Sequence, residues 1–456
     1  MTQRHAVDTH RALRRRMKIA IIGSGIAGNV VAHHLHRDHD VTVFEAAGHV
    51  GGHTHTHNVE LDGERHEIDT GFIVFNDRTY PNFIALLTEL GVESQPSTMS
   101  FSVSDAESGL EYSGASLNSL FAQRRNLLRA SFHRMLRDIL RFNREATAMV
   151  RSERVDAGRF TTISLGDYLA RNGYSREFTR NYLLPMGAAI WSTEPARVLD
   201  FPAQYFVRFF HNHGLLSTGR RPQWRVVRGG SARYVARLTA AFRDRIMLAS
   251  PVQSVRRFPD RVDVTVRGAA PARFDQVFFA CHSDQALRLL SDATPLERQV
   301  LGAIRYQQNE IVLHTDTTLL PRTRRAWAAW NYHLAADAAG GAGQLGAASM
   351  GASLTYNMNI LQSLRSRHTF CVTLNRSAHI DPRCVIQHLV YEHPVYTPEA
   401  VAAQQRQHEL NGAQRTYFCG AYWRYGFHED GVVSALKALR DFSSIQHAQR
   451  HLPRVA

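Results

Sequence analysis

Residues 17–35 read MKIAIIGSGIAGNVVAHHL and decide the fold of this 456-residue chain. An apolar run, a turn with three glycines and a second apolar run predict a buried strand, a tight turn and a helix. A second apolar run, VTVFE, follows and ends at Glu45. A strand, a helix and another strand in this order predict a βαβ unit in a parallel sheet.

The glycines of the turn have the spacing GxGxxG at Gly23, Gly25 and Gly28. In a dinucleotide site the first glycine makes the tight turn and the second lets the backbone approach a pyrophosphate. The third lets the helix pack closely against the strand. Because the glycines lie between a predicted strand and a predicted helix, the pattern indicates a dinucleotide site.

The start of the predicted helix and the end of the second strand support this interpretation. Ile26 and Ala27 begin the helix, whose unpaired N–H groups and positive dipole end favour a phosphate. Glu45 follows Gly23 by 22 residues, where its carboxylate is placed to accept hydrogen bonds from a ribose hydroxyl.

A second glycine pair distinguishes among dinucleotides. Gly51, Gly52 and His53 begin six residues after Glu45 and offer another place where bare backbone can approach a phosphate. This pattern resembles the flavin-containing amine oxidase superfamily, which includes phytoene-desaturase-like and protoporphyrinogen-oxidase-like enzymes. The N-terminal pattern of that superfamily is GxGxxG, an acid, and then GG with Arg or His.

Further segments carry the same resemblance. They are Gly229-Gly230-Ser231, the strand start at Val252, and the C-terminal stretches FCGA and HEDGVVSAL. The resemblance implies FAD, with the backbone at Val252 against the adenine and the start of the last helix facing the flavin pyrimidine. It implies noncovalent binding, because Cys419 is not in a recognisable attachment loop. The other cofactor-binding residues that it implies are Gly71, Phe72, Gly420, Asp430, Gly431 and Val432.

Three longer stretches are similar to a narrower bacterial subgroup of predicted NAD/FAD-binding oxidoreductases. They are DTGFIVFNDRTYPNF (69–83), PMGAAIWS (185–192) and FCGAYWRYGFHEDG (418–431). This subgroup is associated with cyclopropane-fatty-acyl-phospholipid-synthase-like methyltransferases. The similarity implies a lipid or other hydrophobic substrate and a lipid methyltransferase as partner.

Two departures from the superfamily limit what the resemblance implies. Classical amine oxidases hold a lysine in the substrate domain that orients a water at the flavin, but this chain has only Lys18 and Lys437. Lys18 precedes the first strand and Lys437 lies in the last helix, so amine oxidation by that arrangement is disfavoured. Ala421 replaces the usual acid after Gly420, which leaves Glu429 or Asp430 for the ribityl contacts.

The resulting fold class is α/β. We expect a discontinuous Rossmann-type FAD-binding domain (17–75, 225–300 and 410–445) and a mixed α+β substrate domain of the amine-oxidase type (76–224 and 301–409). Residues 76–224 are mostly helical in pattern. Residues 1–16 form an N-terminal tail to which we assign no function, and the Ala- and Gly-rich residues 335–352 predict a flexible loop or loose insertion.

The expected activity is that of an FAD-dependent oxidoreductase, a desaturase or dehydrogenase that moves a hydride from an unsaturated or methyl-branched acyl chain of a membrane lipid to flavin N5. A flavin is a mild oxidant, which favours an allylic or otherwise activated C–H bond. Amine oxidation, redox-neutral double-bond isomerisation, and a noncatalytic flavin-bound lipid-binding partner of a methyltransferase remain as alternatives.

Candidate catalytic and pocket residues follow from the same stretches. His428 and Glu429 could exchange a proton with the substrate, although a supporting or solvent-facing role is the simpler interpretation. Aromatic side chains form the rigid apolar walls that exclude water from a site, although many serve only the core. The candidates for the substrate pocket are Tyr422, Trp423, Trp191, Tyr332 and Tyr356.

The composition bounds the remaining possibilities. The formal net charge is +14, four cysteines show no metal-type spacing, and no apolar run is long enough for a membrane span. These features favour a cytoplasmic location. His53, His55 and His57 alternate as a metal site can, but no matching carboxylate or thiolate spacing is nearby, so we predict no metal.

Residues 117–150 place apolar side chains on one helical stripe and arginines largely on the other faces. A helix packed on the core with a solvated basic face is one interpretation, and a helix lying on an anionic membrane surface is another. With no nucleic-acid-binding motif, we predict no nucleic acid partner. The stripe consists of Leu117, Phe121, Leu128, Phe132, Met135, Ile139 and Phe142.

Overall fold

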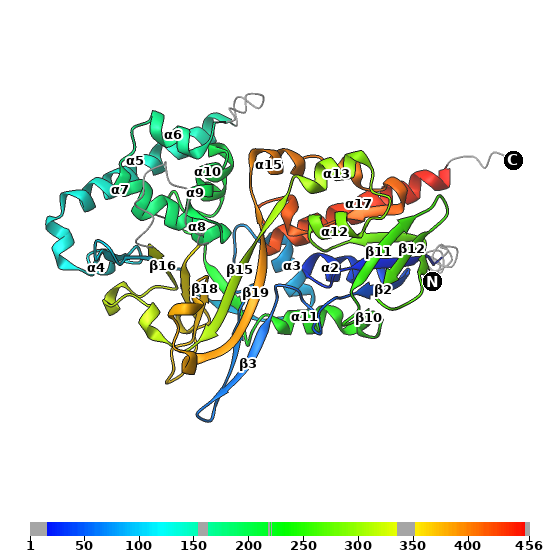
Figure 1. Cartoon of the computed structure of the whole chain (residues 1–456), viewed down its shortest axis with the longest axis horizontal. Helices are drawn as coiled ribbons and strands as arrows, with labels where there is room; N and C mark the ends of the chain where they lie inside the picture. The colour runs from blue at the N-terminus through cyan, green and yellow to red at the C-terminus, as the bar shows by residue number, and fades with distance from the viewer. Residues whose placement is uncertain (1–15, 154–162, 218, 220, 335–351, 452–456) are drawn as a thin grey trace, which may run out of the picture. The chain divides into compact units, whose positions relative to one another are not determined.

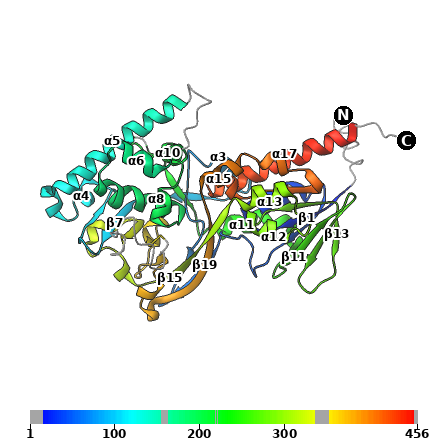
Figure 2. The ribbon, with the colours of Figure 1, turned by 45° about the horizontal axis from the view of Figure 1, so that its top comes forward.

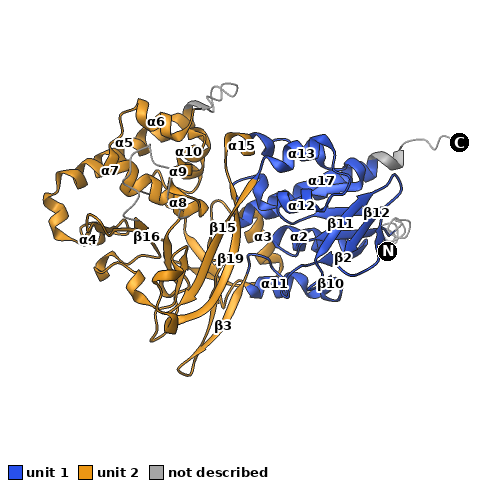
Figure 3. Cartoon of the chain, viewed as in Figure 1, with its two compact units in different colours: residues 1–54, 232–304, 401–456 blue, residues 55–231, 305–400 orange. Residues whose placement is uncertain are grey.

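The computed structural model describes residues 16–153, 163–217, 219, 221–334 and 352–451 (Figure 1). Of the predicted N-terminal tail and the predicted Ala- and Gly-rich loop, only Arg16 and Ala352 lie within the described residues. The chain forms two compact units, of which the first comprises residues 1–54, 232–304 and 401–456 (Figure 3). The second comprises residues 55–231 and 305–400.

The first unit is built on a five-stranded parallel sheet with the order β10-β2-β1-β14-β20. Its central strand, β1, is apolar on both faces, as expected for a parallel strand covered on both sides. From β1 the chain passes to β2 on one side and later to β14 on the other. The strand order therefore reverses beside the carboxyl end of β1, where ligands bind in such sheets. The strands are β1 (Lys18–Ile22), β2 (Asp40–Phe44), β10 (Ile246–Met247), β14 (Gln276–Phe279) and β20 (Thr416–Phe418).

Helices and a small antiparallel sheet complete the first unit. The first helix, α2, packs against the last, α17, and Figure 2 shows α17 running beside the sheet. The helices are α2 (Ile26–Leu35), α11 (Ala232–Thr239), α12 (Ser283–Leu289), α13 (Pro295–Gly302), α16 (Gln407–Leu410), α17 (His428–His451) and the 3₁₀ segments η3 (Ala240–Arg245), η9 (Ala413–Arg415) and η10 (Ala421–Trp423). The small sheet contains β11 (Val252–Arg257), β12 (Val262–Val266) and β13 (Ala272–Phe274).

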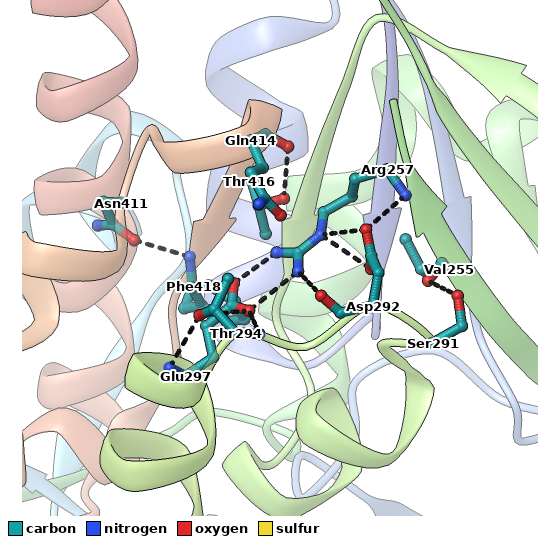
Figure 4. Close-up of polar contacts among 10 residues, drawn as sticks. All are labelled: Val255, Arg257, Ser291, Asp292, Thr294, Glu297, Asn411, Gln414, Thr416 and Phe418. Carbon is teal, nitrogen blue, oxygen red and sulfur yellow. Dashed lines mark hydrogen bonds and ion pairs between the residues drawn. The ribbon is translucent and has the colours of Figure 1, made fainter. Parts of the chain in front are cut away.

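A buried ion pair fastens the small sheet to the helices of the first unit (Figure 4). Arg257 Nε on β11 donates to Asp292 Oδ1 at 3.1 Å, and its Nη2 donates to Glu297 Oε2 at 2.9 Å. Glu297 also closes the capping box of α13 with Thr294. The buried charge of Arg257 is therefore fully paired, as a buried cation requires.

The second unit is built on a seven-stranded sheet with the order β19-β15-β18-β17-β16-β7-β8, antiparallel except between β16 and β7. The second unit also contains two smaller antiparallel sheets. The strands of the large sheet are β7 (Phe101–Asp105), β8 (Glu111–Ser113), β15 (Arg305–His314), β16 (Trp330–Leu334), β17 (Leu354–Asn357), β18 (Cys371–Leu374) and β19 (Val385–Val395). The others are β3 (Thr56–Leu61) with β4 (Glu64–Asp69), and β5 (Phe75–Asn76) and β6 (Ser94–Pro96) on either side of β9 (Trp224–Val227).

Helices occupy most of residues 76–224, as predicted, but β6, β7 and β8 also fall within this range. The helices of the second unit are α3 (Pro81–Glu89), α4 (Leu117–Leu120), α5 (Ala130–Glu153), α6 (Leu165–Arg171), α7 (Arg176–Phe178), α8 (Leu184–Trp191), α9 (Pro195–Val198), α10 (Ala203–Asn212) and α14 (Met358–Leu361), while α15 (Pro398–Gln404) runs into the first unit. Short 3₁₀ or π segments are η1 (Arg124–Leu128), η2 (Thr179–Leu183), η4 (Thr317–Leu319), η5 (Arg324–Ala326), η7 (Ser377–His379) and η8 (Pro382–Cys384).

The prediction of one helical stripe over 117–150 is wrong, because α4, η1 and α5 are separate segments. Gln123 interrupts the stripe, since its side chain donates to Gly109 O and accepts from Glu111 N at the start of β8. Within α5 the apolar face is covered, and Phe132 is only 3% exposed. The core-packed interpretation therefore holds for α5 itself.

The observed units and the predicted domains differ at four boundaries. Residues 55–75 and 225–231 belong to the second unit by their contacts, and residues 301–304 and 401–409 belong to the first. Residues 56–69 form the β3–β4 hairpin, whose strands pair with each other. The assignment of FAD binding to 17–75, 225–300 and 410–445 stays a prediction.

Candidate functional site

The turn after β1 requires glycine at two positions for internal packing. Gly23 has φ of +103°, and a Cβ on it would lie 2.9 Å from the carbonyl oxygen of Ala280, at the end of β14. A Cβ on Gly28 would overlap the carbonyl oxygen of Gly23. These two glycines therefore let β1, β14 and α2 come together, as the GxGxxG pattern predicts.

Gly25 differs from its neighbours because nothing in the protein crowds it. No heavy atom lies within 4 Å of a Cβ built on Gly25, which is the N-cap residue of α2 and makes no side-chain cap. The backbone N–H groups at the start of α2 thus lack a capping side chain and carry the positive end of the helix dipole. This open, uncapped helix start fits a pyrophosphate group.

Glu45 lies where the sequence predicts, directly after β2, and already has protein partners. One carboxylate oxygen accepts from Ser24 N at 2.9 Å and Ser24 Oγ at 2.6 Å, and the other accepts from Ala47 N at 2.8 Å. A carboxylate has about four acceptor positions, so these bonds leave room for a further donor. The ribose contact of Glu45 stays a prediction.

The second glycine turn lies against the first. A Cβ on Gly52 would be 3.2 Å from Gly25 Cα, and Gly51 has φ of +123°, where an added Cβ would lie 2.6 Å from Thr54 O. Two backbone turns without side chains therefore meet beside the start of α2. Together they place backbone that carries no side chains at the carboxyl end of β1, where the strand order reverses.

The start of α17 borders the same place. A Cβ on Gly431 would be 2.7 Å from Ile26 Cγ2, so the first turns of α17 and α2 touch. Gly420 N, after β20, donates to Ser434 Oγ of α17 at 2.7 Å, and Val432 is 2% exposed. The predicted residues at the two ends of the chain are thus brought together with the N-termini of both helices.

Asp430 in the first turn of α17 is buried. It accepts a hydrogen bond from Phe427 N at 3.0 Å and lies 3.5 Å from the guanidinium of Arg424. Burial nevertheless raises the pKa of Asp430 to about 6. A ribityl contact by Asp430 or Glu429, which is also buried, stays a prediction.

His428 belongs to a buried hydrogen-bond chain within the first unit. Its Nε2 bonds with Tyr234 OH at 2.6 Å, and Tyr234 OH bonds with Thr54 Oγ1 at 2.6 Å. Burial lowers the pKa of His428 to about 3, so the imidazole is neutral at physiological pH. This geometry favours a role in holding α17, α11 and the second glycine turn together over proton exchange with a substrate.

Of the three alternating histidines, His55 and His57 pack together with ring centroids 4.1 Å apart, and His53 has a different partner. The ring of His53 stacks on that of His282 at 5.9 Å, whereas His55 and His57 bond with Tyr391 and Thr70. Within the described ranges, no group of three or more His, Cys, Asp or Glu side chains is arranged to hold a metal ion.

Gly71 and Phe72 lie in the second unit, next to a buried carboxylate. Asp69 accepts hydrogen bonds from Ser231 N at 2.9 Å and Ser231 Oγ at 2.7 Å, and Ser231 Oγ also reaches Phe72 O at 3.2 Å. Burial raises the pKa of Asp69 to about 6. Asp69 thus ties the Gly229-Gly230-Ser231 turn to the segment that contains Gly71 and Phe72.

The predicted pocket aromatics are divided between the units. Tyr422 and Trp423 are 3% and 4% exposed in η10 of the first unit, with ring centroids 5.0 Å apart. In the second unit Trp191 is 4% exposed and packs against Phe209 at 4.8 Å. These three rings pack as core residues do, and a pocket role for them stays a prediction.

Tyr332 and Tyr356 belong to adjacent strands of the large sheet. Tyr332 pairs with Leu354 and Trp330 pairs with Tyr356 across β16 and β17, so all four side chains share one face of the sheet. Tyr332 is buried and Tyr356 is half-buried. Val252, the predicted adenine contact, begins β11 as expected, and the pairing register shifts just after it.

Sequence reasoning missed Asp69, Thr54 and Tyr234. Asp69 ends β4, which reads ERHEID and is mostly polar, so the local pattern gives no sign that its carboxylate is buried. Tyr234 gives no signal either, since a tyrosine on an amphipathic helix is usually a core residue.

Residues 26–321 match a family model described as flavin containing amine oxidoreductase. The fold is similar to that of cyclohexylamine oxidase from Brevibacterium oxydans IH-35A, with 17% identity and a TM-score of 0.62 over 95% of this chain and 100% of that one. It is also similar to a putative protoporphyrinogen oxidase from Exiguobacterium sp. 255-15, with 18% identity and a TM-score of 0.64 over 95% and 100%. A CLA-producing fatty acid isomerase from P. acnes has 16% identity and a TM-score of 0.62 over 93% and 98%. A comparison with curated proteins gives no match.

Proposed function

The chain belongs to the flavin-containing amine oxidoreductase family, and within this family we propose that it oxidises unsaturated or methyl-branched acyl chains of membrane lipids with noncovalently bound FAD. Membership makes it a flavin-dependent oxidoreductase. A bound flavin supplies a hydride acceptor, and the protein has to bind it, orient the substrate and exclude water.

The backbone at Gly23, Gly25 and Gly52 of the first unit, which we call the cofactor cradle, supports FAD as the flavin. The uncapped start of α2 offers N–H donors to a pyrophosphate, and the open space at Gly25 leaves room for one. The first turn of α17 adds a second positive helix end beside it, suited to negative charge. A mononucleotide flavin has no pyrophosphate to use the first of these features.

Burial of Cys419 supports noncovalent attachment. Its side chain is fully buried at the end of β20, and burial raises the pKa of the thiol. A thiol that is neither exposed nor ionised is a poor nucleophile for a covalent bond to a cofactor. Acid precipitation followed by chromatography of the supernatant tests both points, because noncovalent FAD is released intact.

The observation that carries the substrate class is the position of the lysines. Lys18 is the first residue of β1 and does not precede the strand as predicted, whereas Lys437 is in α17. Both belong to the first unit, and residues 55–231 and 305–400 contain no lysine. The lysine that classical amine oxidases hold in the substrate domain is therefore missing from the second unit. The predicted pocket residues of that unit, Trp191, Tyr332 and Tyr356, are aromatic and suit an apolar chain.

Redox-neutral isomerisation of a double bond is the second candidate function. It is supported by the similarity in fold to a protein described as a CLA-producing fatty acid isomerase. The motifs shared with the methyltransferase-associated subgroup support a lipid methyltransferase as partner in either case.

Anaerobic flavin absorbance tests the proposal. Purified protein is mixed with a phospholipid carrying an unsaturated chain, with its fully saturated counterpart, and with a panel of amines. We expect bleaching of the oxidised flavin by the unsaturated lipid alone. Bleaching by amines would contradict the proposal, and a shifted double bond without consumption of an electron acceptor would replace it with isomerisation.

A further inference from the structure

Three large apolar side chains protrude where α4 leads into α5. Leu117 is 77% exposed, Leu127 is 50% exposed and Leu128 is 93% exposed. Single exposed leucines are common on protein surfaces, but these three come from a segment of twelve residues. Arg124 holds the segment together, because its guanidinium donates to Asn118 Oδ1 at 2.6 Å and to Phe121 O at 2.8 Å.

The charged side chains of the same segment are all positive. Residues 114–137 contain no Asp or Glu, and their arginines are Arg124, Arg125, Arg129, Arg134 and Arg137. Arg134 forms an ion pair with Glu177 at 2.8 Å. We call Leu117, Leu127, Leu128 and these five arginines the leucine–arginine edge. In Figures 1 and 2, α4 and the start of α5 lie at an edge of the second unit.

The basic surface continues along the exposed face of α5, whose opposite face is buried in the second unit. A hollow of about 530 Å³ lies on this helix, between its basic side chains and Leu216. It contains none of the predicted substrate-pocket residues. The exposed side chains of the face include His133, Arg134, Arg137, Leu140, Arg144 and Arg151.

We propose that the leucine–arginine edge docks the protein on an anionic lipid bilayer. Exposed leucines can enter the boundary between headgroups and acyl chains while the surrounding arginines meet lipid phosphates. The charge complementarity commits the surface to a membrane, since the edge carries five arginines, of which Arg134 is paired with Glu177, and no acid of its own. The docking involves the protruding leucines and leaves the buried stripe of α5 in the core.

This inference goes beyond the proposed function and does not depend on the substrate. No helix among the described residues is long and apolar enough to cross a membrane, so attachment through this edge would be peripheral. Binding is measured without any flavin reaction, so its failure is distinguishable from failure of the acyl-chain proposal.

Vesicle cosedimentation tests the proposal with full-length flavoprotein. Vesicles of phosphatidylglycerol and phosphatidylcholine are compared with vesicles of phosphatidylcholine alone, in low and in high salt. We expect binding to the anionic vesicles that weakens as salt rises. Leu127→Ser with Leu128→Ser should weaken binding at least about tenfold, and Arg129→Gln with Arg137→Gln about thirtyfold in low salt.

Matched controls separate this edge from the overall charge and hydrophobicity. Val390 is 61% exposed on β19 of the same unit, and Val390→Ser removes an exposed apolar side chain outside the edge. Arg365→Gln with Arg383→Gln removes two exposed charges elsewhere in that unit. Both controls should bind within about twofold of the unmodified protein, and all variants should keep its melting temperature.

Two outcomes would overturn the proposal. One is binding to anionic vesicles that the edge variants and the controls weaken equally. The other is no binding at all, and in that case analytical ultracentrifugation shows whether the chain self-associates and whether Leu127→Ser with Leu128→Ser abolishes the self-association. Self-association that these substitutions abolish would make the edge an interface between copies of the chain.

Discussion

The proposed cofactor cradle of the first unit and the predicted aromatic pocket residues of the second unit are built from different parts of the chain. The cradle consists of backbone at Gly23, Gly25 and Gly52, and its geometry depends on the absence of side chains. The predicted pocket consists of side chains such as Tyr332 and Tyr356 that also fill a core. A backbone site therefore leaves a specific mark in the sequence, whereas a side-chain site is hard to separate from ordinary packing.

Gly28→Ala should have the largest effect on stability. A Cβ at this position overlaps the Gly23 carbonyl oxygen, so we expect the free energy of unfolding to fall by about 3 kcal/mol. Gly48→Ala is the matched control in the same unit, because nothing lies within 4 Å of its added Cβ. Equal stability of the two variants in urea unfolding would contradict the packing role of Gly28.

Two buried carboxyls, one in each unit, should give the protein a stability that depends on pH. The pKa values of Asp430 and Asp69 are both raised to about 6, so the folded protein holds protons that the unfolded chain has released. The free energy of unfolding should therefore fall as pH rises from about 4 to about 6, by up to about 3 kcal/mol for each carboxyl.

Asp430→Asn and Asp69→Asn assign this dependence to one unit or the other. Each variant should flatten the pH dependence by its own share in urea unfolding at several pH values. A stability that rises over this interval, or variants with an unchanged slope, would show that these carboxyls are ionised in the folded protein.

Tyr234→Phe should have a smaller effect, confined to the first unit. It removes the hydroxyl between Thr54 and His428, and we expect a loss of about 1–3 kcal/mol in unfolding free energy. A double-mutant cycle with Thr54→Val measures the coupling between the hydroxyls of Thr54 and Tyr234.

His428→Asn should leave the acid side of the pH dependence of turnover unchanged. If the variant instead loses a titration near neutral pH from this dependence, His428 acts as a catalytic base.

Tyr356→Leu should have the smallest effect and concerns the second unit. If Tyr356 lines the pocket, the variant raises KM for the lipid substrate by up to about tenfold with little change in stability, because the side chain is half-buried. Loss of stability with an unchanged KM would place Tyr356 in the core alone.

The sequence sufficed for the βαβ opening, because that follows from glycine sterics and strand patterns. The strand start at Val252 and the juxtaposition of the chain ends were implied by the family resemblance. The sequence did not suffice for the break between α4 and α5, which depends on a contact between Gln123 and Glu111. It also could not decide whether Trp191 belongs to the core or lines a pocket, since both environments are apolar. Tyr234 and Thr54 were missed because only the fold brings them to His428.

The flavin content of Gly25→Val tests the central claim most directly, namely that bare backbone at the start of α2 receives the cofactor. Nothing in the protein lies near an added Cβ there, so the variant should keep the circular dichroism and melting behaviour of the flavin-free protein. We predict that it purifies without flavin and does not bind added FAD. A folded variant that retains a full complement of flavin would contradict the claim.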